Sequence, residues 1–173
     1  MKALVIYRSK TGYSKTYAEW IARQLGADLR EYRSVSPACF VAYDTIIYGA
    51  GLYVVGINGI RLIKDHLDEL RDKQVIVFAT GATPERAETI DQIRDANFTP
   101  DQQRFVRFFY LRGGFNFSKL CLIDKLLMTL LRLRLRFKKV KTPDDRGMLA
   151  AFSQPLDLTK EQNLAPLLLS LRP

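Results

Sequence analysis

Short apolar runs alternate along the chain with stretches whose apolar residues recur at helical spacing. Residues 3–7 form a continuous apolar run, short enough for a strand that is buried on both faces. Beyond Gly12 the apolar residues recur at three- and four-residue steps, which predicts an amphipathic helix. These residues are Tyr17, Trp20, Ile21 and Leu25. The turn between run and helix therefore directs backbone N–H groups out of a helix N-terminus.

The same strand-turn-helix order repeats further along the chain. Strands are predicted over residues 3–7, 27–32, 45–48, 74–79 and 105–111, and helices over residues 13–25, 58–70, 85–96, 118–139 and 159–172. The turn at 49–51 contains two glycines, and Thr83-Pro84 predicts the start of the helix over 85–96. The last helix is expected to dock through leucines at helical spacing, which are Leu164, Leu167, Leu168 and Leu171. Units with such short connections indicate an α/β fold with a parallel sheet, and any ligand is expected at the carboxyl ends of its strands.

The composition agrees with one folded domain over residues 1–173. The hydrophobic content of 47% is enough for a core without disulfides. The two cysteines, Cys39 and Cys121, are far apart in a pattern that matches no metal or redox motif, as is typical of reduced thiols in a cytosol. The first apolar run is too short for a signal peptide or a membrane span. We therefore expect a cytoplasmic protein.

The first turn has the composition of a phosphate-binding loop. Its residues are Ser9, Lys10, Thr11, Gly12, Tyr13 and Ser14. The hydroxyl groups donate neutral hydrogen bonds, and Gly12 allows the backbone to approach a ligand closely. The turn has neither the ATP/GTP loop pattern nor the dinucleotide pattern, so those two ligand classes are disfavoured. The alternative interpretation is that the hydroxyl groups simply cap the helix.

This loop resembles the first loop of flavodoxins, which has the pattern Ser/Thr-x-Thr-Gly-x-Thr/Ser and surrounds the phosphate of FMN. Ser9, Thr11, Gly12 and Ser14 match that pattern position by position. The resemblance implies that FMN is the cofactor. It also implies a flavodoxin-like, doubly wound, five-stranded parallel sheet in the order 2-1-3-4-5, with helices on both faces.

The resemblance places two further loops against the flavin ring. The second loop comprises Gly49, Ala50, Gly51, Leu52 and Tyr53, and the third comprises Thr80, Gly81 and Ala82. In flavodoxin-like proteins an aromatic residue of the second loop often stacks on the ring, a role that Tyr53 would take here. The alternative for Tyr53 is packing at the start of the next helix, and the alternative for the third loop is a simple turn.

The predicted helix over 118–139, capped by Ser118, narrows the resemblance. The local sequence Asp124-Lys125-Leu126 is similar to the flavodoxin-type protoporphyrinogen IX dehydrogenase (oxidase) group. That likeness implies an FMN-dependent oxidoreductase that passes electrons to a quinone-like acceptor, with a porphyrinogen as substrate. The alternative is a flavodoxin-type electron carrier that serves redox proteins. No catalytic residue is assigned, and no metal site is expected because His66 is the single histidine and is predicted to be solvated.

The charge of the chain adds a further expectation about partners. Lys and Arg total 27 against 18 Asp and Glu, a net charge of +9. Basic residues cluster in the segment 132–141, after a leucine-rich stretch that Asp124 and Lys125 interrupt, and residues 142–147 are predicted to form a polar turn. The helix over 118–139 is interpreted as a core helix, as a homodimer seam or as a helix at the membrane surface. Its basic end is interpreted as a peripheral contact with the inner face of the cell membrane, as a contact with an acidic partner or as a solvated segment without a partner. Nucleic acid is not expected, because no aromatic residues are interleaved with the basic ones.

Overall fold

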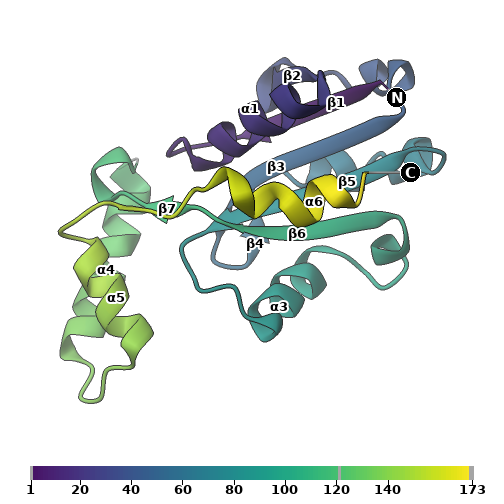
Figure 1. Ribbon diagram of the computed structural model, residues 1–173. Helices are drawn as coiled ribbons and strands as arrows, with labels where there is room; N and C mark the ends of the chain where they lie inside the picture. The colour runs from purple at the N-terminus through teal and green to yellow at the C-terminus, as the bar shows by residue number, and fades with distance from the viewer. Residues whose placement is uncertain (1, 121, 172–173) are drawn as a thin grey trace.

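A parallel sheet forms the centre of the computed structural model, which describes residues 2–120 and 122–171 (Figure 1). Its long strands are β1 (Ala3–Arg8), β2 (Asp28–Glu31), β3 (Thr45–Tyr53), β5 (Gln74–Gly81) and β6 (Val106–Arg112). They lie in the order β2-β1-β3-β5-β6, and all neighbouring pairs are parallel. The predicted α/β fold class and the order 2-1-3-4-5 of the five long strands are confirmed. An additional short strand, β4 (Gly56–Ile57), pairs antiparallel with the end of β3.

The strands are apolar on both sides because helices cover both faces of the sheet. Leu4, Val5 and Ile6 are fully buried although they point alternately to opposite faces. The first face packs against α1 (Tyr13–Leu25) and against α6 (Ala165–Leu169), which crosses the front of the sheet in Figure 1. The leucines predicted to dock the C-terminal segment do so: Leu164, Leu167 and Leu171 are buried, and Leu168 packs against the same cluster.

The second face packs against α2 (Arg61–Lys64) and α3 (Ala87–Asn97). The helix predicted over 58–70 is shorter than expected: it consists of α2 and a 3₁₀ turn over Leu67–Leu70. Gly59, within the predicted range, has a positive φ of 74°, so the helix begins only after this residue.

Two predicted helix starts are wrong, because regular helix begins later than predicted in both places. The start of α3 is preceded by Arg86 rather than by Thr83, whose carbonyl oxygen accepts a hydrogen bond from the Tyr110 hydroxyl. The C-terminal segment predicted as one helix begins with a 3₁₀ turn over Glu161–Leu164 before α6 starts. In both places a tertiary contact or a tighter turn replaces the regular helical hydrogen bonds.

A helical hairpin follows β6 and lies beside the sheet (Figure 1). It consists of β7 (Gly114–Phe115), a 3₁₀ turn over Phe117–Lys119, α4 (Leu122–Phe137), α5 (Pro143–Ala151) and β8 (Leu156–Asp157). Strands β7 and β8 pair with each other and close the hairpin at its base. Among the described helices, none is both long enough and apolar enough to cross a bilayer.

The structure of the helical hairpin differs from two predictions made from the sequence. Ser118 does not cap α4. It lies in the preceding 3₁₀ turn, where its N–H and its hydroxyl donate to the side chain of Asn116. The stretch predicted as a polar turn after residue 141 is the start of α5. Thr142 caps this helix through a reciprocal pair of hydrogen bonds with Asp145, a capping box that also explains the clustered polar residues.

Candidate functional site

The three candidate loops meet at the carboxyl ends of β1, β3 and β5. Because these strands are adjacent and parallel, Arg8 of β1 lies opposite Ala50 of β3, and Ala50 lies opposite Ala79 of β5. The first loop, residues 9–14, therefore begins at the level where the second and third loops leave the sheet. This edge is the expected ligand position in an open α/β sheet.

The first loop presents the N-terminus of α1 without a side-chain cap. Gly12 occupies the N-cap position with a positive φ of 103°, and no described side chain bonds to the first-turn N–H groups as a cap. The Ser9 hydroxyl instead accepts from the Gly12 N–H at 3.0 Å and fixes the turn. A Cβ at Gly12 would meet nothing within 4 Å, so the space in front of the turn is open. This arrangement disfavours the simple cap and fits an anion such as a phosphate group.

A buried pair of hydroxyl groups joins the first loop to the third. The Oγ of Ser14 lies 2.7 Å from the Oγ1 of Thr80, and the two residues are 2% and 6% exposed. A Cβ added to Gly51 would lie 3.8 Å from the Ser14 oxygen and 3.9 Å from the Thr80 oxygen. Residues from all three loops therefore converge here. Since one hydroxyl accepts from the other, the pair keeps one proton that can be donated to a ligand.

The second loop differs from the prediction. Gly49 and Ala50 are not in a turn: they lie within β3 and are buried. A Cβ at Gly49 would lie 1.9 Å from the Phe78 ring, so glycine is needed there for packing. The strand continues to Tyr53 because β4 supplies hydrogen-bond partners, and the chain turns at Val54, which has a positive φ of 58°.

Tyr53 consequently lies at the end of a strand, not at the start of a helix. Its side chain is 49% exposed, whereas Leu52 is half-buried against the core. The Asn58 side chain donates to the Gly51 carbonyl at 2.8 Å and holds the hairpin of β3 and β4 closed. Asn97 of α3 also bonds to this hairpin, through the Ile57 N–H. Sequence reasoning missed both asparagines, because their role depends on the fold of a hairpin that it did not predict.

Lys10 connects the first loop to α4. Its Nζ lies 2.6 Å from the Oδ2 of Asp124 and 5.8 Å from the centre of the Tyr53 ring. Asp124 is 8% exposed, so this carboxylate is held almost entirely within the structure. Lys10 is therefore placed between the second loop and the helical hairpin of α4 and α5. Sequence reasoning singled out both residues, but it contained no signal that they would meet.

The base of the helical hairpin, where β7 pairs with β8, packs against the third loop. Gly113 donates its N–H to the Gly81 carbonyl at 2.8 Å, and the Tyr13 hydroxyl donates to the Leu156 carbonyl at 3.1 Å. Burial, and secondarily the charge of Asp157, raises the pKa of Tyr13, which keeps its hydroxyl protonated as a donor. The third-loop residue Ala82 packs against the apolar cluster of the hairpin, which contains Phe115, Ala151 and Phe152.

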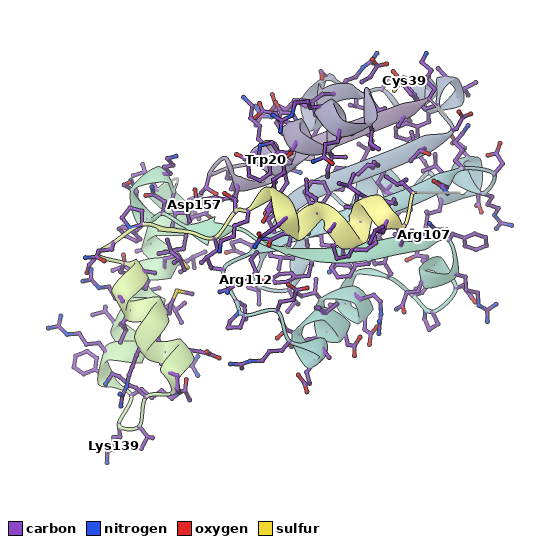
Figure 2. All side chains as sticks on the ribbon, in the orientation of Figure 1. Trp20, Cys39, Arg107, Arg112, Lys139 and Asp157 are labelled. Carbon is purple, nitrogen blue, oxygen red and sulfur yellow. The ribbon has the colours of Figure 1, made fainter. Side chains whose placement is uncertain are left out.

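Arg112 ends β6 (Figure 2), and its buried Nε has no hydrogen-bond partner among the described residues. Within residues 2–120 and 122–171, no group of three His, Cys, Asp or Glu side chains could hold a metal ion.

His66 is half-buried beside Phe40 and bonds to the Leu62 carbonyl at 3.0 Å, so its predicted solvation is wrong. Cys121 lies outside the described residues.

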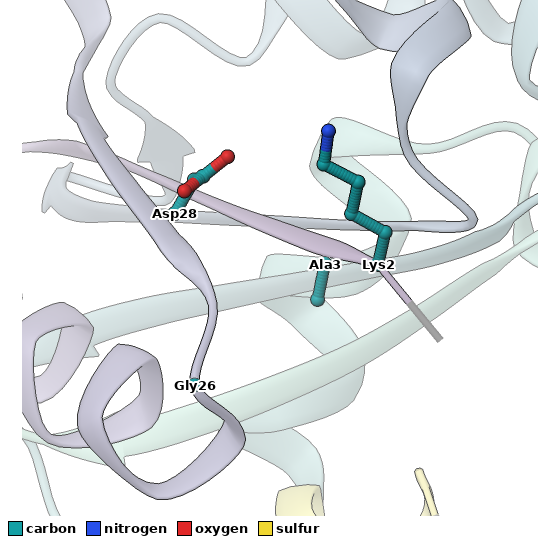
Figure 3. Close-up of a pocket in the computed structure, with 4 residues that line it drawn as sticks. All are labelled: Lys2, Ala3, Gly26 and Asp28. Atoms are coloured by element: carbon teal, nitrogen blue, oxygen red, sulfur yellow. The ribbon is translucent and has the colours of Figure 1, made fainter.

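An open pocket at the opposite edge of the sheet has a different character. It has a volume of about 290 Å³ and is lined by Lys2, Ala3, Gly26 and Asp28 (Figure 3). These residues lie at the amino end of β1 and around the start of β2, away from the three loops. The pocket is therefore not part of the candidate site.

Similarities to known proteins are found among solved structures and in one family model. The chain is similar to the Trp repressor binding protein of Bacillus subtilis, with 18% identity, a TM-score of 0.49 and coverage of 66% of this chain and 88% of that one. It is also similar to an FMN complex of a flavoprotein from Lactobacillus acidophilus, with 17% identity, a TM-score of 0.41 and coverage of 64% and 91%. No curated protein was found to match. The family model described as the flavodoxin domain matches residues 4–139, so the chain belongs to the flavodoxin domain family.

Proposed function

We propose that this protein binds FMN and acts as an oxidoreductase that passes electrons to a quinone-like acceptor. The observation that carries the proposal is the uncapped N-terminus of α1 behind Gly12, with the Ser9 hydroxyl bonded to the Gly12 N–H, the Ser14 hydroxyl in the first turn and Thr11 in the same loop. This set of neutral donors suits a phosphomonoester. When bound, FMN supplies the redox chemistry, and the protein sets its position and its access.

The residues assigned to the flavin follow from where the three loops meet. The first loop would bind the phosphate through first-turn N–H groups and hydroxyl groups, and the Ser14–Thr80 pair would fix the depth of the ligand. The exposed Tyr53 ring and the backbone of residues 80–82 would lie on either side of the isoalloxazine. Gly49 and Ala50 are buried in β3, so the proposal gives them a packing role only.

The surroundings of Tyr53 support an organic acceptor. Tyr53 and Val54 are 49% and 84% exposed and form an apolar corner that a flat, largely apolar ring can contact. The Lys10 ammonium group lies 5.8 Å from the Tyr53 ring centre. Asp124 holds this ammonium group in place at 2.6 Å, and the remaining N–H donors of Lys10 could bond to a carbonyl oxygen of a bound ring. A porphyrinogen, the donor implied by the resemblance, is the first substrate to test.

The test follows electron transfer directly. The FMN-loaded protein is reduced under anaerobic conditions and mixed with menadione, and reoxidation of the flavin is followed by its absorbance. The proposal predicts reoxidation that saturates with menadione and is faster than that of free reduced FMN at the same concentration. Protoporphyrinogen supplied as the donor should reduce the oxidised protein. Reoxidation no faster than that of free FMN, combined with rapid transfer to a redox protein, would support the carrier function and contradict the oxidoreductase.

A further inference from the structure

Helix α4 exposes a continuous row of large apolar side chains. Seven of its residues are between 41% and 84% exposed. They are Leu122, Ile123, Leu126, Leu127, Leu130, Leu133 and Phe137. We call this set the outer face of α4. A large exposed apolar area of this kind on an otherwise well-packed domain marks a surface that contacts another apolar phase.

The outer face is continuous because its members share one side of the helix. At about 100° per residue, the seven side chains fall within about 140° of the helix circumference. The opposite side carries Asp124, Met128, Leu131 and Leu135, which are buried or half-buried. Met128 packs against the apolar cluster around Phe152. The helix is therefore docked to its own domain through one side, and the apolar outer face is additional to that docking.

Positive charge surrounds the outer face. Between residues 119 and 141 the chain has eight basic residues, and Asp124 is the single carboxylate in that stretch. Asp124 lies on the inner side of the helix and is bonded to Lys10, so it does not offset the charge at the outer face. Arg134, Arg136 and Lys139 are exposed, and Lys139 stands at the end of the hairpin that is far from the sheet (Figure 2).

We propose that the outer face of α4 binds an anionic lipid surface, with the helix lying in the plane of the membrane interface. The apolar side chains would enter the boundary between headgroups and acyl chains, and the flanking Arg and Lys side chains would contact lipid phosphates. The 16-residue helix is about 24 Å long, which suits a helix lying in the interface. A second copy of the chain fits less well, because its outer face would bring the same positive charge against this one.

The proposal does not depend on flavin binding, but it bears on the candidate site. Because Lys10 of the first loop is bonded to Asp124 of α4, the lipid-facing helix is joined directly to the loop at the carboxyl end of the sheet. A docked protein would hold this edge of the sheet near the membrane surface.

The test is co-sedimentation of the full chain with vesicles. Phosphatidylcholine vesicles are compared with vesicles that also contain phosphatidylglycerol, at low and at high salt. The expected result is binding to the anionic vesicles alone, with an affinity that falls as salt rises. The triple variant Arg134→Gln/Arg136→Gln/Lys139→Gln should bind about 100-fold more weakly, at about fivefold for each charge removed. A control with the same net charge, Arg30→Gln/Arg33→Gln/Arg61→Gln, changes exposed arginines elsewhere and should bind like the unaltered protein.

A second set of variants tests the apolar contribution. Leu126→Ser/Leu130→Ser/Phe137→Ser should lower vesicle binding at least tenfold at low salt, whereas Val41→Ser/Leu169→Ser, at exposed positions elsewhere, should not. Equal binding of the basic variant and its control would overturn the proposal. It would also be overturned if anionic vesicles failed to bind the protein while sedimentation velocity showed a dimer that the outer-face variant converts to a monomer. In that case a second copy covers the face.

Discussion

The buried hydroxyl pair of Ser14 and Thr80 allows a quantitative test of how the first and third loops are joined. Ser14→Ala and Thr80→Val each remove one hydroxyl group and leave the other buried without its partner. The two oxygens are 2.7 Å apart, and both residues are less than 10% exposed, so water cannot easily replace the lost bond. An unsatisfied buried hydroxyl costs about 1–3 kcal/mol, so each single variant should lose about that much free energy of unfolding.

The double variant distinguishes this bond from other effects of the two substitutions. With both hydroxyl groups removed, no polar group remains unsatisfied, so the loss should be smaller than the sum of the two single losses. The coupling free energy should be at least about 1 kcal/mol, the net value of one hydrogen bond. The measurement is urea unfolding of the flavin-free protein followed by circular dichroism, with slopes compared to confirm that the unfolding transition has not changed in character.

A matched control combines Thr80→Val with Ser34→Ala. Ser34 is exposed and follows β2, so that β1 and β3 separate it from Thr80 in β5. This pair should be additive within about 0.5 kcal/mol. A coupling for Ser14 and Thr80 that is no larger than this control would refute the conclusion that the hydroxyl pair joins the two loops.

Two further predictions concern β3, which replaces the expected turn, and helix α5 of the helical hairpin. Gly49→Ala would place a Cβ 1.9 Å from the Phe78 ring and should cost about 3 kcal/mol in urea unfolding, whereas Gly147→Ala, where a Cβ meets nothing within 4 Å, should be neutral or stabilising. A hydrogen bond from Lys138 lowers the pKa of Asp145 from 3.8 to about 2, so its stabilisation of α5 is present above about pH 4 and is lost as the pH falls towards 2. Hydrogen exchange of α5 amides should show that loss in the unaltered protein and not in Asp145→Asn; the same pH profile in both would contradict it.

The first strand, the first helix and the position of the loop between them could be predicted because their signals are local, whereas the order of the sheet was implied by the resemblance to flavodoxins. The apolar run of β1, the single Gly12 and the change to helical spacing all lie within 25 residues, and the structure forms them as expected. Leu164, Leu167 and Leu171 were likewise predicted from spacing alone to be buried. Local patterns succeed here because each element is buried in the way that its own periodicity requires.

The second loop could not be predicted, because its conformation depends on partners elsewhere in the chain. Two glycines after a buried run normally favour a turn, yet Gly49 and Gly51 continue β3. Gly49 accommodates the Phe78 ring from the neighbouring strand, and β4 extends the pairing as far as Tyr53. A glycine that provides space for packing and a glycine that forms a turn are indistinguishable in a single sequence.

The contact between the hairpin and the site was also beyond local reasoning. Lys10 and Asp124 are separated by 114 positions, and each was interpreted as part of its own segment. Helix α5 was missed because Pro143 and the acidic residues after it read as a turn, although the same residues are favoured in the first turn of a capped helix. The Lys10–Asp124 ion pair forms only once the fold brings the two segments together.

The central claim is that the first loop binds a phosphomonoester, and a comparison of FMN with riboflavin tests it most directly. The two flavins share the same ring and differ in the phosphate group. Titration of the flavin-free protein, followed by quenching of flavin fluorescence, should give an affinity for FMN at least about 100-fold higher than that for riboflavin, since charge-assisted hydrogen bonds contribute about 1.5–3 kcal/mol each. Equal affinities for the two flavins, or no binding of either, would contradict the account.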